Sequence, residues 1–111
     1  MNNLHLSKEA QKDLAEIKAY ITEELENPDA ALATVSRITK KIRVLKNQAY
    51  VGTPISSVAD TESDYRFLVS GNYLVFYRAY GKNVYIDRVL YGRRDYMRIL
   101  FGDAQTNETD E

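Results

Sequence analysis

The sequence predicts a single α+β domain in which an antiparallel helical hairpin packs on an antiparallel sheet of three to four strands. Two observations carry this prediction. The first half of the 111-residue chain repeats apolar residues at helical spacing. Residues 65–91 are instead rich in β-branched and aromatic residues and are divided by glycine-containing turns. We therefore expect one domain over residues 1–102, followed by an acidic, disordered tail over residues 103–111.

The N-terminal elements follow from a short alternation and a long helical stripe. Residues 3–6 alternate polar and apolar side chains, which is typical of a strand. Ser7 comes next and can cap a helix whose first turn contains Glu9. Helical spacing then predicts a helix over residues 8–25, and its apolar stripe consists of Ala10, Leu14, Ile17 and Ile21.

A second helix follows after a very short turn, so that the two helices form a hairpin. Asn27 and Pro28 supply a cap and a first-turn proline, and the helical spacing runs on to Ala49. Residues 51–64 lose any periodicity and predict a loop. Beyond it we expect a three-stranded meander and a short helix, over residues 65–70, 73–80, 84–91 and 93–101.

The composition excludes several classes of site. The chain has no cysteine and one histidine, so a disulfide, a thiolate metal site and a nucleophile–histidine pair all lack their parts. We therefore expect no metal and no cofactor. Neither a long apolar run nor a leader-type N-terminus is present, which predicts a cytoplasmic protein without a membrane contact.

Charge is unevenly distributed along the chain, although the net charge is only −1. Residues 65–101 carry seven basic and two acidic side chains, and the remainder of the chain is net acidic. A cationic segment of this kind predicts an anionic partner, either a phosphate backbone or an acidic peptide. The candidate contact residues are Arg66, Arg78, Arg88, Arg93, Arg94 and Arg98.

Four short strings carry a resemblance to a known family. They are Tyr65–Arg66, Ser70–Gly71, Val75–Arg78 and Ile86–Tyr91, in this order behind a helical hairpin. Together they resemble the RelE/ParE superfamily of type II toxin–antitoxin toxins, and are closest to its ParE-like branch, although Tyr91 stands where the family has histidine. The resemblance implies a growth-inhibiting toxin, a cognate antitoxin, and contact with operator DNA only through that antitoxin.

The resemblance leaves the mode of growth arrest open between two branches. ParE-like members inhibit DNA gyrase without established catalytic residues, whereas RelE-like members cleave messenger RNA on the ribosome. A nuclease would use Arg66 and Arg94 as phosphate-binding cations and Tyr73 or Tyr96 for proton transfer. Tyr73, however, stands where the nuclease branch has an arginine, and a tyrosine base would need guanidinium groups to lower its pKa.

We therefore expect ParE-like binding to DNA gyrase. One alternative is a ribosome-dependent messenger RNA endonuclease, and another is an inactive remnant that only regulates its operon with its antitoxin. The antitoxin would place an acidic segment in the apolar groove of the hairpin and on the basic sheet face. In the free protein, the acidic tail beyond Gly102 could occupy that basic face instead.

Each candidate site residue also has a purely structural interpretation. Arg66, Arg78 and Arg88 could each be a solvated or salt-bridged strand residue, with Asp87 as a candidate partner of Arg88. Tyr73, Tyr77 and Tyr85 could be core residues or could stack on bases at an exposed sheet face. Arg93 and Arg94 are the favoured functional pair, because they follow Gly92, where the backbone leaves the last strand.

Overall fold

The fold was obtained as a computed structural model that describes residues 1–58 and 62–102, so the predicted acidic tail lies outside the described residues. Both predicted helices of the hairpin, the meander and the short C-terminal helix are present. None of the described helices is long and apolar enough to span a membrane. The elements are β1 (Asn3–Leu6), α1 (Lys8–Glu23), α2 (Pro28–Val44), β2 (Thr53–Pro54), η1 (Ile55–Ser57), β3 (Arg66–Ser70), β4 (Tyr73–Tyr80), β5 (Asn83–Tyr91) and α3 (Tyr96–Phe101).

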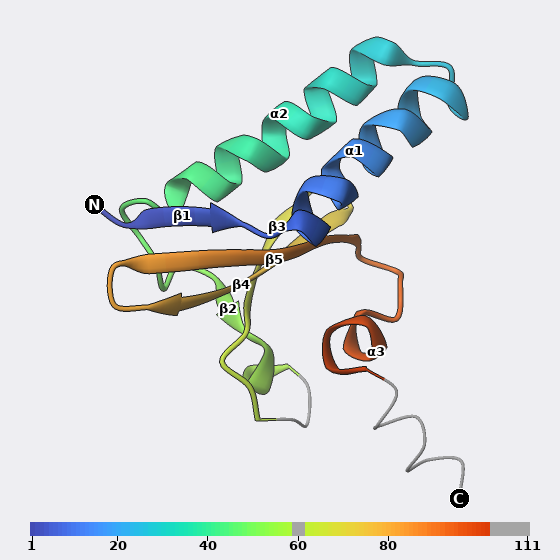
Figure 1. Ribbon diagram of the computed structural model, residues 1–111. Coiled ribbons are helices and arrows are strands. Elements are labelled where there is room, and N and C mark those ends of the chain that lie inside the picture. The colour runs from blue at the N-terminus through green and yellow to red at the C-terminus, as the bar shows by residue number, and fades with distance from the viewer. Residues whose placement is uncertain (59–61, 103–111) are drawn as a thin grey trace, which may run out of the picture.

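The sheet is larger than the sequence predicts, and it is not wholly antiparallel. Its strand order is β1-β5-β4-β3-β2, and β1 runs parallel to β5, as Figure 1 shows. The predicted α+β class is confirmed, but the expected three- to four-stranded antiparallel sheet has five strands and one parallel pair. The alternation in residues 3–6 indicates a strand without specifying its partner, which lies about eighty residues downstream.

Capping residues set the ends of the helical hairpin. The Ser7 hydroxyl accepts a hydrogen bond from the Ala10 amide at 2.9 Å, and the Asn27 side chain accepts one from the Ala30 amide at 3.1 Å. These bonds satisfy amides that the first turn of a helix otherwise leaves without partners. Both helices end earlier than the sequence predicts: α1 ends at Glu23 and not at residue 25, and α2 ends at Val44, so that Leu45 and Ala49 of its apolar spacing lie beyond it.

Two apolar clusters lie on opposite faces of the sheet. The hairpin of α1 and α2 covers one face, and α3 lies against the other (Figure 1). The larger cluster joins residues of both helices, including Ile38 and Leu45, to Val75, Tyr77 and Ile86 of the sheet. The smaller cluster is centred on Ile55, Phe76 and Leu90 and receives Tyr96 and Met97 from α3. Side chains that alternate along β4 therefore belong to different cores.

A β-bulge in β5 redirects one arginine toward α1. Phe76 pairs with Arg88 and Tyr77 pairs with Ile86, so Asp87 is the extra residue of β5. Arg88 then donates two hydrogen bonds to the carboxylate of Asp13, at 2.8 and 2.9 Å. The bulge thus lies next to the arginine that links β5 to the first helix.

Candidate functional site

A groove lies between the helical hairpin and the end of the sheet at which β4 begins and β5 ends. Its volume is about 660 Å³. The wall is largely apolar and aromatic, and a single arginine stands at the sheet end. Among the lining residues are Glu16, Ile17, Tyr20, Tyr73, Tyr91 and Arg94. Because Tyr20 and Tyr91 are 53% and 39% exposed, both rings are available to a partner.

The turn after β5 holds Arg94 at the rim of this groove. The Gly92 amide donates to the Asn72 carbonyl at 2.8 Å, and the Arg94 amide donates to the Tyr91 carbonyl at 3.0 Å. These bonds fix the backbone, while the side chains of Arg93 and Arg94 are exposed. Within the parts of the chain that the structure describes, neither side chain makes an ion pair. Both guanidinium groups are therefore available to an anionic partner.

Arg66, by contrast, is held by the backbone between α2 and β2. Its Nη1 donates to the carbonyl of Gly52 at 2.8 Å and to that of Tyr50 at 3.2 Å. The guanidinium also lies over the Tyr50 ring, 5.0 Å from its centroid. The Gly52 amide of the same loop donates a hydrogen bond to the hydroxyl of Tyr77 in β4 at 2.8 Å. Arg66 thus fastens a loop to the sheet.

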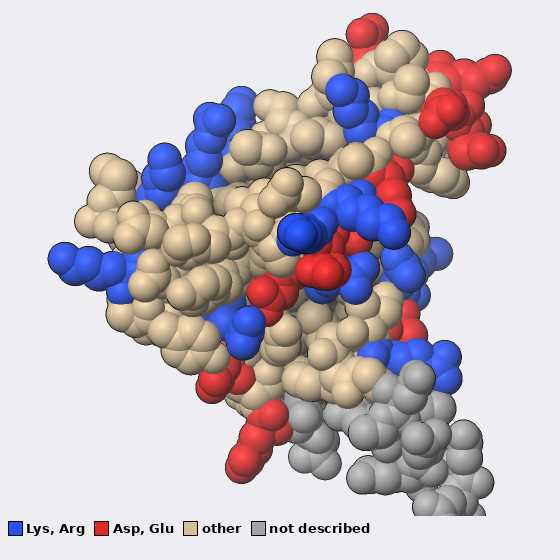
Figure 2. Space-filling model, viewed as in Figure 1, with Lys and Arg blue, Asp and Glu red and all other residues tan. Residues whose placement is uncertain are grey.

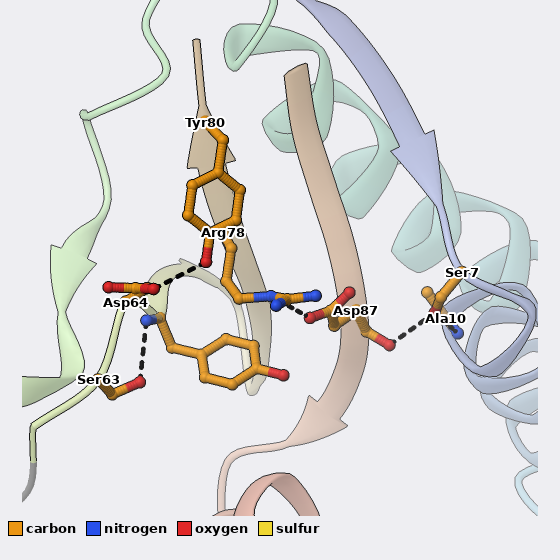
Figure 3. Close-up of polar contacts among 8 residues, drawn as sticks. Ser7, Ala10, Ser63, Asp64, Arg78, Tyr80 and Asp87 are labelled. Carbon is orange, nitrogen blue, oxygen red and sulfur yellow. Dashed lines mark hydrogen bonds and ion pairs between the residues drawn. The ribbon is translucent and has the colours of Figure 1, made fainter. Parts of the chain in front are cut away.

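Arg78 belongs to a polar network on the sheet face opposite the hairpin (Figure 3). Its Nε lies 2.8 Å from Oδ2 of Asp87, and its guanidinium lies over the rings of Tyr65 and Tyr80. The Tyr80 hydroxyl donates to Asp64 at 2.8 Å. Two carboxylates thus offset the one guanidinium of this network, and the face is not a cationic patch.

Tyr65 has the most strongly shifted pKa in this network. Burial, followed by the carboxylate of Asp87 beside its hydroxyl, raises the pKa of Tyr65 to about 12. The backbone is fixed there as well, because the Tyr65 amide donates to the Ser63 hydroxyl at 2.9 Å. Tyr65 is therefore a protonated, structural residue at neutral pH.

The six arginines that the sequence predicts as contacts fall into two groups. Three are engaged inside the chain: Arg66 with loop carbonyls, Arg78 with Asp87, and Arg88 with Asp13. Arg88 does not pair with Asp87, the partner that its position in the sequence suggests. The other three, Arg93, Arg94 and Arg98, are exposed and follow β5, although Arg98 is not without a partner.

The four candidate residues for RNA cleavage do not meet. Tyr73 and Arg94 share the groove. Arg66 holds the loop after α2, and Tyr96 packs on Phe76 on the opposite face of the sheet, with ring centroids 5.2 Å apart. Burial, followed by the neighbouring hydroxyl of Tyr91, raises the pKa of Tyr73, whereas a general base needs a lowered one.

The predicted stacking tyrosines are also separated. Tyr77 is fully buried between the hairpin and the sheet, as the core alternative predicts, and it does not lie on an exposed face. Tyr73 packs against the same core. Tyr85 alone is on the open face, where its ring stacks on His5 with centroids 5.0 Å apart. The alternation along a strand predicts which side chains share a face of the sheet, but it does not predict which face the hairpin covers.

One set of exposed cations was missed by the sequence analysis. Basic side chains gather over the C-terminal half of α2, whereas acidic side chains gather at the tip of the hairpin (Figure 2). The net charge of all residues outside 65–101 is negative, because acidic residues, including those at the tip, outnumber the basic residues, so this sum conceals the cations of α2. A count over a ten-residue window reveals them as Arg37, Lys40, Lys41, Arg43 and Lys46.

Comparison with known proteins identifies the family. The family described as "ParE toxin of type II toxin-antitoxin system, parDE" matches residues 4–96. The chain therefore belongs to the ParE toxin family of the RelE/ParE superfamily, and it is the toxin component of a type II toxin–antitoxin system with a cognate antitoxin.

A solved structure has the same fold. A chain in the structure titled "Chromosomal ParDE TA system from P. aeruginosa" is 24% identical, with a TM-score of 0.67. The match covers 82% of the present chain and 96% of the other. At this identity the likeness shows the fold alone. No curated protein matches the chain.

Proposed function

We propose that this toxin arrests growth by binding DNA gyrase and does not cleave RNA. The observation that carries the proposal is the separation of Arg66, Tyr96 and Arg94. Metal-free RNA cleavage needs a base, a cation and an acid within reach of one phosphate. Here Arg66 is engaged with loop carbonyls, Tyr96 lies on the opposite face, and Arg94 stands at the groove.

The groove has the character of a protein-binding surface. Exposed Tyr20 and Tyr91 stand on an apolar wall, with Arg94 at its rim. Tyrosine and arginine are over-represented among the residues that dominate binding energy at protein interfaces. A protein partner could pack on the rings of Tyr20 and Tyr91 at the centre of the interface and form an ion pair with Arg94 at its edge. This supports gyrase, a protein target, over an RNA target.

The antitoxin, we infer, silences the toxin by covering the same groove. The apolar wall suits an amphipathic segment, and Arg93 and Arg94 at its end suit acidic side chains. A segment that folds as it binds could follow the whole groove. In this proposal operator DNA is recognised by the antitoxin, and both proteins act in the bacterial cytoplasm, where gyrase is.

Expression of the toxin without its antitoxin tests the proposal. We expect arrested chromosome replication and filamentous cells with intact messenger RNA, and inhibition of supercoiling by purified gyrase. Arg94→Ala should weaken both effects. Lys12→Ala, which removes an exposed cation of α1 outside the groove, serves as the matched control and should leave both unchanged.

The same experiment separates the alternatives. Because Tyr73 and Arg94 share the groove, the nuclease remains the second candidate. Prompt cleavage of translated messages that is lost in both Tyr73→Phe and Arg94→Ala would establish the nuclease and refute the gyrase proposal. An absence of any growth defect at normal protein levels would leave a remnant that only regulates its operon.

A further inference from the structure

We propose that the basic face of α2 binds the sugar-phosphate backbone of duplex DNA, independently of base sequence. We name as the basic stripe Arg37, Lys40 and Lys41, with Arg43 and Lys46 as flanking cations. The choice of DNA rests on the proposed function, since gyrase acts on duplex DNA. The groove that holds Arg94 is a separate surface, and the two have no lining residue in common in the part of the chain that the structure describes.

The stripe lies along a shallow groove between α2 and the turn that joins β3 to β4. Arg37, Lys40, Lys41 and Val44 follow the three- and four-residue spacing that places side chains on one face of a helix. Ser70 and Gly71 form the other side, and the volume is about 420 Å³.

Gly71 leaves the sheet side of this groove open. Its φ is +58°, which favours glycine, and a Cβ placed there would meet no atom within 4 Å. The turn therefore presents bare backbone beside the basic stripe, and a phosphate chain can approach it closely.

The charge on this face has no internal balance. Residues 37–46 hold five basic side chains and no acidic one, and all five are exposed. None takes part in an ion pair of the described residues, which are Arg78–Asp87 and Arg88–Asp13. Like charges three and four residues apart on a helix repel each other. The fold therefore bears a repulsion that a bound polyanion would relieve.

The helix dipole explains only part of this pattern. Cations stabilise the last turn of a helix, and Lys41 and Arg43 are placed there. Arg37 and Lys40 precede that turn, so the dipole gives no reason for their charge.

The surroundings of the stripe favour a duplex over a single strand or an acidic peptide. Proteins that bind single strands stack the bases on aromatic rings, and no aromatic residue is among the described residues that line this groove. An acidic peptide segment that folds on binding would need apolar anchor sites, and among the lining residues within 1–58 and 62–102 only Val44 is large and apolar. From Arg37 to Arg43 the cations extend along about 9 Å of α2, at 1.5 Å per residue, which spans about two to three phosphates of one strand of a duplex.

The opposite end of the hairpin would orient the duplex. Exposed acidic side chains gather at its tip, as Figure 2 shows, and they repel phosphate. They are Glu23, Glu24, Glu26 and Asp29. A duplex on the stripe would therefore cross the base of the hairpin and stay away from its tip.

Fluorescence anisotropy of a labelled 20-base-pair duplex with the purified full chain tests the proposal. We expect salt-dependent binding that does not vary with sequence. The variant Arg37→Gln/Lys40→Gln/Lys41→Gln should bind at least about tenfold more weakly at 100 mM salt, with the slope of log K against log salt lower by about 2 to 3. The matched control, Lys8→Gln/Lys12→Gln/Lys18→Gln, removes three exposed cations of α1 and should change the affinity less than twofold. Circular dichroism melting checks that both variants are folded.

Three results would overturn this inference: no duplex binding by the native chain at 50 mM salt, an equal loss in both triple variants, or tighter binding of a single strand or of poly-glutamate than of the duplex. A parallel gyrase assay keeps the two proposals distinct. Gyrase inhibition without duplex binding would refute the role of the basic stripe alone. Duplex binding without gyrase inhibition would refute the proposed target alone.

Discussion

Arg88 of β5 and Asp13 of α1 form a bidentate ion pair across 75 residues of sequence, and the amide of Val89 donates a third hydrogen bond to the same carboxylate. The Asp13 side chain is 5% exposed. Such a carboxylate is stable in the interior because charged and neutral donors satisfy it. The pair joins the first helix to the central part of the sheet.

Replacement of Asp13 should therefore lower the free energy of unfolding far more than replacement of an exposed aspartate. We expect Asp13→Ala to lower the free energy of unfolding by about 3 kcal/mol, because the half-buried Arg88 loses its counter-charge. Urea denaturation measures the loss. Asp29→Ala, an exposed residue in the first turn of α2, should cost about 0.5 kcal/mol. Similar losses in the two variants would contradict a structural role for the pair.

The Tyr77 hydroxyl should contribute through the amide of Gly52. Tyr77→Phe leaves that buried amide without its acceptor, which should cost about 1 to 3 kcal/mol. Tyr80→Phe removes an exposed hydroxyl and should change stability little. Gly52→Ala should be at least as harmful as Tyr77→Phe, because its Cβ would lie 2.5 Å from the Tyr77 hydroxyl and 2.9 Å from the Phe67 carbonyl. Thermal and urea unfolding measure the stability loss of the three variants. A loss in Tyr80→Phe as large as that in Tyr77→Phe would contradict the prediction.

Stability should fall in alkaline solution in a way that depends on Tyr65. Its pKa is about 12 in the folded chain and about 10 when unfolded. Its contribution is therefore complete below pH 10 and is lost as the pH rises through 12. Urea unfolding between pH 9 and 11.5 should show a shallower decline for Tyr65→Phe than for the native chain. The control Tyr50→Phe should show the same decline as the native chain. An equally steep decline in Tyr65→Phe and in the native chain would contradict this prediction.

Arg66 and Arg94 should separate stability from toxicity. Arg66→Ala removes two hydrogen bonds to loop carbonyls and should lower the free energy of unfolding by about 1 to 2 kcal/mol while growth arrest persists. Arg94→Ala should leave stability within about 0.5 kcal/mol and weaken growth arrest. Loss of toxicity in a fully stable Arg66→Ala protein would show that Arg66 contacts the target.

Local patterns in the sequence predicted most of the secondary structure. The caps at Ser7 and Asn27 and the turns at Gly71 and Gly81 are local signals that the structure confirms, whereas the second apolar stripe runs past the end of α2 at Val44. The pairing of β1 with β5 could not be predicted, because register between distant segments leaves no mark in either one. Sequence reasoning also missed that Asp13, within an apolar stripe, would be buried.

Prediction of the site was limited for the same reason. Arg66, Arg78 and Arg88 were identified by charge, and charge alone does not tell whether a distant carboxylate or carbonyl has already engaged a guanidinium. Arg93 and Arg94 follow a glycine at a strand end, which is a local signal for exposure, and they are exposed.

The parallel pairing of β1 with β5 also orders events during synthesis. The strand β1 is synthesised first, but it cannot pair until β5 has been synthesised, because Asn3 to Leu6 pair with Asn83 to Ile86. Until residue 86 has left the ribosome, a nascent chain can form the helical hairpin but not the edge of the sheet that supports it. A chain cut short before β5 also lacks Arg88, the partner of Asp13. We therefore expect a chain that ends before β5 to lack both the strand pairing and the ion pair that hold β1 and α1 against the sheet.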